Sequence, residues 1–93
     1  MLDADFTPAF NRDRKKCKKK HWDGSGLNEA IKAVMESDTQ AIPSRFNDHA
    51  LSGNMQGYRE LHVGGRKSDW LLIYKVEGNV AVFVRSGTHD ELY

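Results

Sequence analysis

The stretch DWLLIYKVEGNVAVFVRSG, residues 69–87, decides how the second half of this 93-residue chain folds. Two runs rich in aliphatic, β-branched and aromatic residues, Asp69–Val76 and Asn79–Gly87, are separated by a short turn sequence centred on Gly78. Two such runs joined by a tight glycine-containing turn are typical of a β-hairpin. We therefore predict two antiparallel strands here.

Successive side chains along a strand point to opposite faces of the sheet. Val80, Val82 and Val84 form a uniform apolar stripe, and the pattern predicts that they face the helices of the protein. Phe83 and Arg85 are then expected on the opposite, open face. The open face is predicted to be polar and to carry the binding surface.

The rest of the chain supplies two helices and further strands. Apolar spacing predicts one helix from Pro8 to about His21 and a second from about Leu27 to Ser37. Ser25 is the expected N-cap of the second helix. A strand is predicted at Tyr58–Val63, with Glu60 and His62 on one face, and a short edge strand at about Leu2–Phe6. The segment 38–57 is predicted to be a long loop, a kind of segment that is often functional.

Together these elements predict an α+β fold in a single domain, residues 1–93. An N-terminal helical hairpin is expected to pack on a twisted antiparallel sheet of three to four strands. Apolar residues make up 39% of the chain and charged residues 29%, and no apolar run approaches the roughly 20 residues that cross a bilayer. No secretory signal is evident, and the single cysteine, Cys17, excludes an internal disulfide. A cytoplasmic protein without a membrane partner is expected.

Basic residues gather in the first helix, although the net charge of the whole chain is only +1. The cluster consists of Arg12, Arg14, Lys15, Lys16, Lys18, Lys19 and Lys20. Such a density of positive charge suits a phosphate backbone, but it also suits a solvated helix face or an acidic protein partner. Phe6, Phe10 and Trp22 lie among these residues and are candidates to anchor the helix to a core.

Three histidines, His49, His62 and His89, lie in strands and connections of the second half. As metal ligands they lack a compact spacing, and Cys17 as a nucleophile is far in sequence from any of them. A third chemistry, the acid–base cleavage of RNA, fits better, because histidine transfers protons near neutral pH and RNA carries its own 2′-hydroxyl nucleophile. Arg85 offers a cation for the phosphate charge, and an aromatic ring, Tyr93 or Trp70, offers a surface for stacking on a base.

Four motifs occur in a fixed order: NDHxLxG (Asn47–Gly53), GYRxxHV (Gly57–Val63), DWLLIYK (Asp69–Lys75) and RxGTHxxLY (Arg85–Tyr93). This order resembles the YafQ-type branch of the RelE toxin superfamily, over about residues 5–93. The resemblance implies a bacterial type II toxin that cuts mRNA in the ribosomal A site, without a metal or small-molecule cofactor. It also implies three partners, namely the ribosome, mRNA and a cognate antitoxin protein.

The resemblance further implies the members of an active site. By their places in the motifs they are His49, His62, Asp69, Arg85, His89 and Tyr93. His89 is expected to act as the acid and His49 or His62 as the base, with Arg85 near the phosphate. The C-terminal residues are therefore expected to be ordered against the sheet. The connection Gly64–Ser68 looks longer than in relatives, which could displace Asp69.

The basic residues of the first helix would, by the same resemblance, contact ribosomal RNA. Two alternatives stay open. One is a non-catalytic module of the same fold that binds an antitoxin or RNA, and the other is a metal-dependent hydrolase that uses the histidines.

Overall fold

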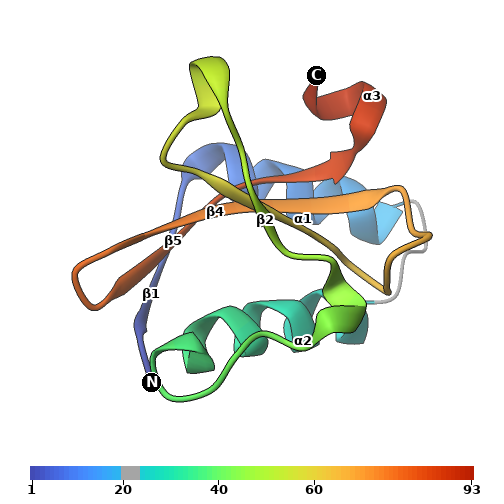
Figure 1. Cartoon of the computed structure of the whole chain (residues 1–93). Coiled ribbons are helices and arrows are strands. Elements are labelled where there is room, and N and C mark those ends of the chain that lie inside the picture. Colours follow the sequence, from blue (N-terminus) through green and yellow to red (C-terminus); the bar gives the residue numbers. More distant parts are fainter. Residues whose placement is uncertain (20–23) are drawn as a thin grey trace.

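The computed structural model describes residues 1–19 and 24–93 and has an α+β fold (Figure 1). In chain order the elements are β1 (Asp3–Phe6), α1 (Pro8–Lys19), α2 (Gly24–Met35), η1 (Glu36–Asp38), η2 (Ser44–Phe46), β2 (His49–Ala50), η3 (Gly53–Met55), β3 (Arg59–His62), β4 (Trp70–Glu77), β5 (Val80–Thr88) and α3 (His89–Leu92). The predicted roles of Lys20 and Trp22, and the predicted end of the first helix at His21, lie outside the described residues.

The predicted hairpin is confirmed. Strands β4 and β5 pair antiparallel from Trp70 opposite Thr88 to Glu77 opposite Val80, with a two-residue connection between them. Gly78, the first residue of that connection, has φ +59, a conformation that glycine adopts without steric cost. Strands β3, β4 and β5 begin and end within one residue of the predicted positions.

The sheet differs from the expectation in its size and direction. The described residues form a mixed sheet of five strands in the order β1-β5-β4-β3-β2, not an antiparallel sheet of three to four. The edge strand at the N-terminus pairs parallel with β5, because the chain passes through α1 and α2 before it reaches the central strands. A second short edge strand, β2, lies within the segment that was predicted to be a loop.

The two long helices contribute to one core. Phe10 and Cys17 of α1 are buried together with Leu27 and Val34 of α2. In Figure 1, α2 and α3 lie on opposite faces of the sheet, while α1 lies beside β5. The direct packing of α1 on α2 as a hairpin stays a prediction.

Ser25 is not the N-cap of the second helix. Helix α2 already begins at Gly24, so Ser25 is its second residue. The helix extends through the glycines because burial of its apolar face outweighs their low helix propensity. Gly26 also lies close to Val63, the residue after β3, since a Cβ there would be 3.7 Å from Cγ1 of Val63, an ordinary contact distance.

The faces of β5 are opposite to those predicted for its first half. Ala81 and Phe83 are fully buried in the core, whereas Val80, Val82 and Val84 are only half-buried. The ring of Phe83 stacks on Phe6 at 5.3 Å between centroids. An aromatic ring buries more apolar surface than a valine and gains from such stacking, and these two effects decide the face.

A β-bulge then reverses the alternation. Tyr74 pairs with Phe83, but the preceding residue Ile73 pairs with Arg85, so Val84 is the extra residue of the bulge. Arg85 therefore lies on the open face, as expected, although Phe83 two residues earlier lies in the core. The side chain of Thr7 donates a hydrogen bond of 2.8 Å to the carbonyl of Val84.

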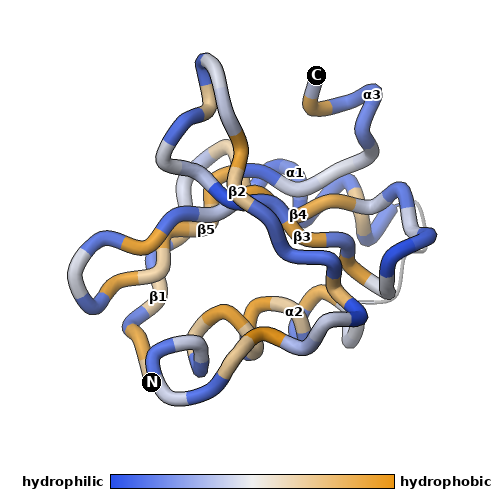
Figure 2. The backbone as a smooth tube through the Cα atoms, viewed as in Figure 1, coloured by the Kyte–Doolittle hydropathy of each residue, from blue (hydrophilic) through white to orange (hydrophobic). Residues whose placement is uncertain are grey.

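Hydrophobic residues follow the central strands and α2, whereas α3 is mostly hydrophilic (Figure 2). The fully buried large side chains include Phe10, Phe46, Leu61, Leu72, Tyr74 and Phe83. Among the described residues, no helix combines the length and apolar character that a membrane span requires.

The assignment of the core face can be tested with two truncations on β5. Phe83→Ala should lower the free energy of unfolding by about 3–5 kcal/mol, because it leaves a cavity between the sheet and the helices. Val82→Ala, on the other face, should cost about 1 kcal/mol. Urea unfolding followed by circular dichroism measures both. An equal or larger cost for Val82→Ala would contradict the burial of Phe83.

Candidate active site

Residues of three strands, β3, β4 and β5, lie in two rows on the open face of the sheet. Glu60 on β3 pairs with Ile73, which pairs in turn with Arg85. Two residues further along β3, His62 pairs with Leu71, which is opposite Gly87. Residues that are directly opposite in neighbouring strands share a face. The prediction that Glu60, His62 and Arg85 share one face is thus confirmed, although Leu71 and Ile73 at the centre of that face are apolar and buried.

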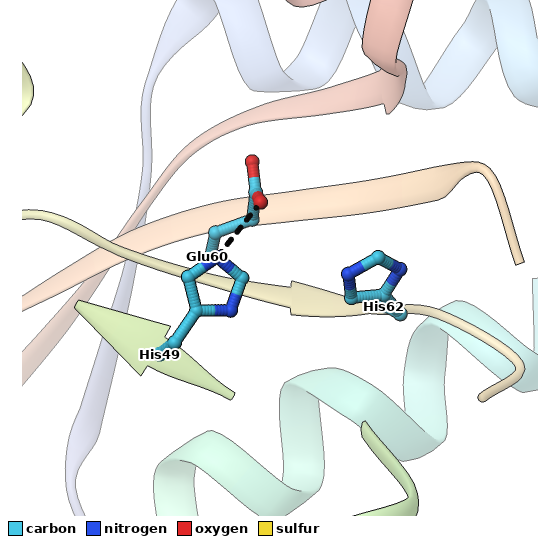
Figure 3. Close-up of side chains that lie close together, drawn as sticks. All are labelled: His49, Glu60 and His62. Carbon is cyan, nitrogen blue, oxygen red and sulfur yellow. Dashed lines mark ion pairs between the residues drawn. The ribbon is translucent and has the colours of Figure 1, made fainter. Parts of the chain in front are cut away.

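Glu60 lies at the centre of this site although its surroundings are largely closed. Its residue exposure is 7%. One carboxylate oxygen, Oε1, accepts a 2.7 Å hydrogen bond from the hydroxyl of Tyr93, and the other, Oε2, lies 3.2 Å from Nε2 of His49 (Figure 3). A buried carboxylate is tolerated when its oxygens have such partners. Glu60 thus connects the edge strand β2 with the C-terminal residue.

Both ring nitrogens of His49 face oxygen atoms. Nδ1 lies 2.8 Å from the carbonyl of Asn47, and Nε2 faces Glu60. A carbonyl only accepts, so Nδ1 carries a proton. The contact with Glu60 then needs one more proton, either on Nε2 or on the carboxyl group. A histidine in hydrogen-bond contact with a carboxylate is an arrangement that general acid–base catalysis can use.

His62 is held in a different way. Its Nδ1 lies 2.8 Å from the carbonyl of Ser68, so this nitrogen is the donor and Nε2 carries the lone pair of the neutral ring. The rings of His62 and His49 are 6.2 Å apart between centroids. The connection 64–68 does not separate Asp69 from this site, because its last residue binds His62 directly.

The segment that carries His49 is fixed by its neighbour Asp48. Arg59 donates two hydrogen bonds to Oδ2 of Asp48, at 2.7 and 3.2 Å, and the hydroxyl of Tyr74 donates to Oδ1. Burial, followed by this bond to a carboxylate, raises the pKa of Tyr74. The buried phenol of β4 therefore stays protonated and holds the short edge strand in place.

The C-terminal residues are ordered against the sheet, as predicted. Thr88 caps α3 in a reciprocal capping box with Glu91. The ring of His89 lies 4.9 Å from that of Tyr93, and its backbone N–H points to Oδ1 of Asp69 at 3.4 Å. A Cβ at Gly87 would lie only 3.1 Å from Oε1 of Glu91, so the absence of a side chain there lets α3 lie close to β5.

One predicted site residue lies elsewhere, and two residues that contact the site were not predicted. Trp70 is not a stacking surface, because it is buried in the core and its Nε1 donates a 2.9 Å hydrogen bond to Ser86. Glu60 and Asp13, which contact predicted site residues, were not predicted. The position of Glu60 two residues before His62 was the available signal. Asp13 gave none, because its partner Arg85 is 72 residues away in sequence.

Arg85 shares the open face with Glu60 but is also bound by helix α1. Asp13 accepts hydrogen bonds from its Nε and Nη2, at 2.7 and 3.1 Å. The exposed fraction of the Arg85 side chain is still 39%. Its charge is therefore fixed in place and remains accessible to an anion.

The basic cluster of α1 divides into two groups. Arg12, Lys15, Lys16, Lys18 and Lys19 are exposed. Arg14 is half-buried, with its guanidinium carbon 4.9 Å from the ring centroid of Phe6 and 5.1 Å from that of Phe10. The expected anchoring of the basic helix by these two aromatic rings is confirmed, and Arg14 takes part in it through cation–π contacts.

His49, Glu60 and His62 also form a group that could hold a metal ion. One ligand atom from each residue lies within 4.8 Å of the others, and imidazole nitrogen with carboxylate oxygen suits several divalent metals. A metal at this position would occupy the atoms that otherwise exchange protons. The same cluster therefore supports either acid–base chemistry or metal binding.

Comparison with known protein families places the chain in a class, the bacterial toxins of type II toxin–antitoxin systems. Within this class, the sequence model of the YafQ toxin family matches residues 2–93. The chain therefore belongs to the YafQ family, and the resemblance seen in its motifs is confirmed.

Named relatives and solved structures are similar over nearly the whole chain. The mRNA interferase toxin YafQ of Escherichia coli K12 is 33% identical over 91 residues, which cover 98% of this chain and 95% of the relative. A chain in the E. coli DinJ–YafQ toxin–antitoxin complex is 32% identical with a TM-score of 0.85, covering 99% and 97% of the two chains. A copper-bound mutant toxin from Helicobacter pylori is 32% identical with a TM-score of 0.88 over the full length of both.

The bond between Tyr93 and Glu60 gives a test in alkaline solution. Removal of the hydroxyl from water, and then its bond to the carboxylate, raises the pKa of Tyr93 from 10.0 to about 12. Because the folded pKa is higher than the unfolded one, the stabilisation is fully present below pH 10 and is lost as the pH rises through about 12.

The ultraviolet absorbance of phenolate, compared between wild type and Tyr93→Phe, should show Tyr93 still protonated near pH 11, about one unit below its raised pKa. Glu60→Gln removes the negative charge, so Tyr93 should ionise at a lower pH in that variant. Ionisation of Tyr93 at the ordinary value in wild type would show that the bond to Glu60 does not form.

Proposed function

We propose that this chain is a ribosome-dependent mRNA interferase, the toxin of a type II toxin–antitoxin system. It cleaves mRNA in the ribosomal A site and so inhibits translation in the cytoplasm. The observation that carries the proposal is the group of His49, Glu60 and Tyr93 on the open face, in a chain of the YafQ family. The E. coli relative named an mRNA interferase supports the same activity.

The cleavage step follows from the chemistry of RNA. A base removes the proton of the 2′-hydroxyl, whose oxygen then attacks the adjacent phosphorus. An acid protonates the leaving 5′-oxygen, and a cation stabilises the charge on the phosphate oxygens. The histidine–carboxylate pair of His49 and Glu60, or the lone pair of His62, supplies the base. His89, at the start of α3, supplies the acid.

The remaining members of the site bind and orient. Arg85 contacts the scissile phosphate, and the ring of Tyr93, whose residue is 55% exposed, stacks on a base. Asp69 holds the backbone at His89. The exposed basic residues of α1, together with Arg14 and Lys20, contact ribosomal RNA through its phosphates.

A cognate antitoxin is the proposed protein partner. The E. coli relative has been crystallised in complex with DinJ. A non-catalytic module would bind the same antitoxin but would leave mRNA intact, so cleavage itself separates the two functions.

Cleavage of translated mRNA tests the proposal directly. Primer extension on mRNA from a purified translation system should show cuts with wild type and a loss of about 10²- to 10⁴-fold for His89→Ala and His62→Ala. The cleavage activity of Glu60→Gln should fall by a similar factor. The matched control is Glu77→Gln, which replaces an exposed carboxylate on β4 and should cleave normally. Naked RNA should be cut poorly. If wild type leaves translated mRNA intact, the toxin function is wrong; if the variants remain active, the site assignment is wrong.

The copper-bound relative and the group His49, Glu60 and His62 make a metal-dependent hydrolase a specific second candidate. To distinguish it, the protein is treated with a chelator, and the chelator is removed before ribosomes are added. Acid–base cleavage predicts an unchanged rate. It also predicts inhibition by added copper(II), which would occupy the proton-transferring atoms. A rate that disappears on treatment and returns with one metal would establish the second candidate.

A further inference from the structure

Asp13 is a buried carboxylate in an otherwise basic helix. It is the only acidic residue of α1, and its exposed fraction is 5%. Besides the two hydrogen bonds from Arg85, its Oδ2 accepts a 3.0 Å bond from the backbone N–H of Ser86. Burial of a charge is costly unless it is paired and hydrogen-bonded, and here one side chain on β5 and the adjacent backbone meet that need.

The three bonds restrict Arg85 more than a single ion pair would. Bonds to Nε and Nη2 fix the plane of the guanidinium group, because the two donors form a rigid fork. The bond to Ser86 fixes the backbone next to it. Three of the five guanidinium N–H groups are left for another acceptor, on a side chain that stays partly exposed.

The residue just before α1, Thr7, also contacts the β-bulge that turns Arg85 to the open face. The hydroxyl of Thr7 donates to the carbonyl of Val84 and accepts a 3.0 Å hydrogen bond from the backbone N–H of Phe10 in the first turn of the helix. Asp13 in α1 and Thr7 just before the helix therefore contact both the side chain of Arg85 and the backbone on either side of it.

We propose that Asp13 is a positioning residue for Arg85. It holds the guanidinium where the scissile phosphate will lie, and it joins the basic helix and the active site into one rigid unit. A helix that binds ribosomal RNA through its exposed lysines then also sets the position of the phosphate-binding arginine. The inference rests on the proposed function, because it assigns Asp13 a role in that reaction.

A double-mutant cycle tests the proposal with cleavage on translating ribosomes as the readout. Asp13→Asn should lower the maximal rate about 10- to 100-fold, as expected for a displaced catalytic contact, with little change in the ribosome concentration at half-maximal rate. In an Arg85→Ala background the same substitution should cause no further loss, because Asp13 acts through Arg85. The matched control is Asp38→Asn, which removes a carboxylate paired with the N-terminus.

A second variant and an NMR measurement test the contact between Asp13 and Arg85 in other ways. Arg85→Lys retains the charge but lacks the planar fork that Asp13 holds, so its cleavage rate should fall about as much as that of Asp13→Asn. It tests the same geometry without a change at Asp13, and therefore serves if Asp13→Asn folds poorly. In the NMR spectrum, the Nε–H of Arg85 should exchange slowly with water in wild type and faster in Asp13→Asn.

Three results would overturn the role of Asp13. They are a normal rate for Asp13→Asn where Arg85→Ala is slow, additive losses in the double variant, and full activity of Arg85→Lys. Inactivity of wild type would instead refute the proposed function, so the two failures are distinguishable.

Discussion

The structure depends on the bulge in the pairing of β4 and β5. Phe83 and Arg85 are two residues apart on one strand, and regular alternation would put both on the same face. The extra residue Val84 separates them, so that Phe83 fills the core and Arg85 joins Glu60 across the open face. Without the bulge, either the phenyl ring would be exposed or the guanidinium would be buried without water. Exposure of the ring would lose apolar burial, and burial of the guanidinium would remove a charge from water, so both arrangements would cost free energy.

The site is built around a second constraint, the partners of the buried Glu60. Its two oxygens face residues that are far apart in sequence, His49 on the edge strand and Tyr93 at the last position. Each of these is held in turn, His49 by the carbonyl of Asn47 and Tyr93 by the short helix that Thr88 caps. Short segments that would fray alone are thus ordered by contacts with one central carboxylate.

The local patterns of the sequence were sufficient to predict β1, β3, β4, β5 and the two long helices, because apolar spacing and turn residues act over short distances. The order of the C-terminal residues followed from the family resemblance instead, since local composition indicated only a polar tail. The face of β5 that packs on the helices was predicted wrongly for the first half of the strand. Three valines outnumber one phenylalanine in the pattern, but the phenylalanine ring buries more apolar surface than a valine and stacks on another ring. The bulge has no compositional signal. The parallel pairing of β1 and the role of Asp13 depend on contacts about 72 or more residues apart, which periodicity does not record.

The polar groups that would bind a substrate already have partners in the free protein, although Arg85 keeps three N–H groups for a further acceptor. Arg85 is bonded to Asp13, and Glu60 is bonded to Tyr93 and faces His49. A phosphate or a base must share or replace these bonds, so the net gain on binding free RNA is small. Prior alignment of the mRNA by a larger assembly would remove the entropic cost of orientation and leave only the final contacts to this site. Occupied polar groups on an open face therefore favour an enzyme that acts on RNA presented by the ribosome over one that captures RNA by itself.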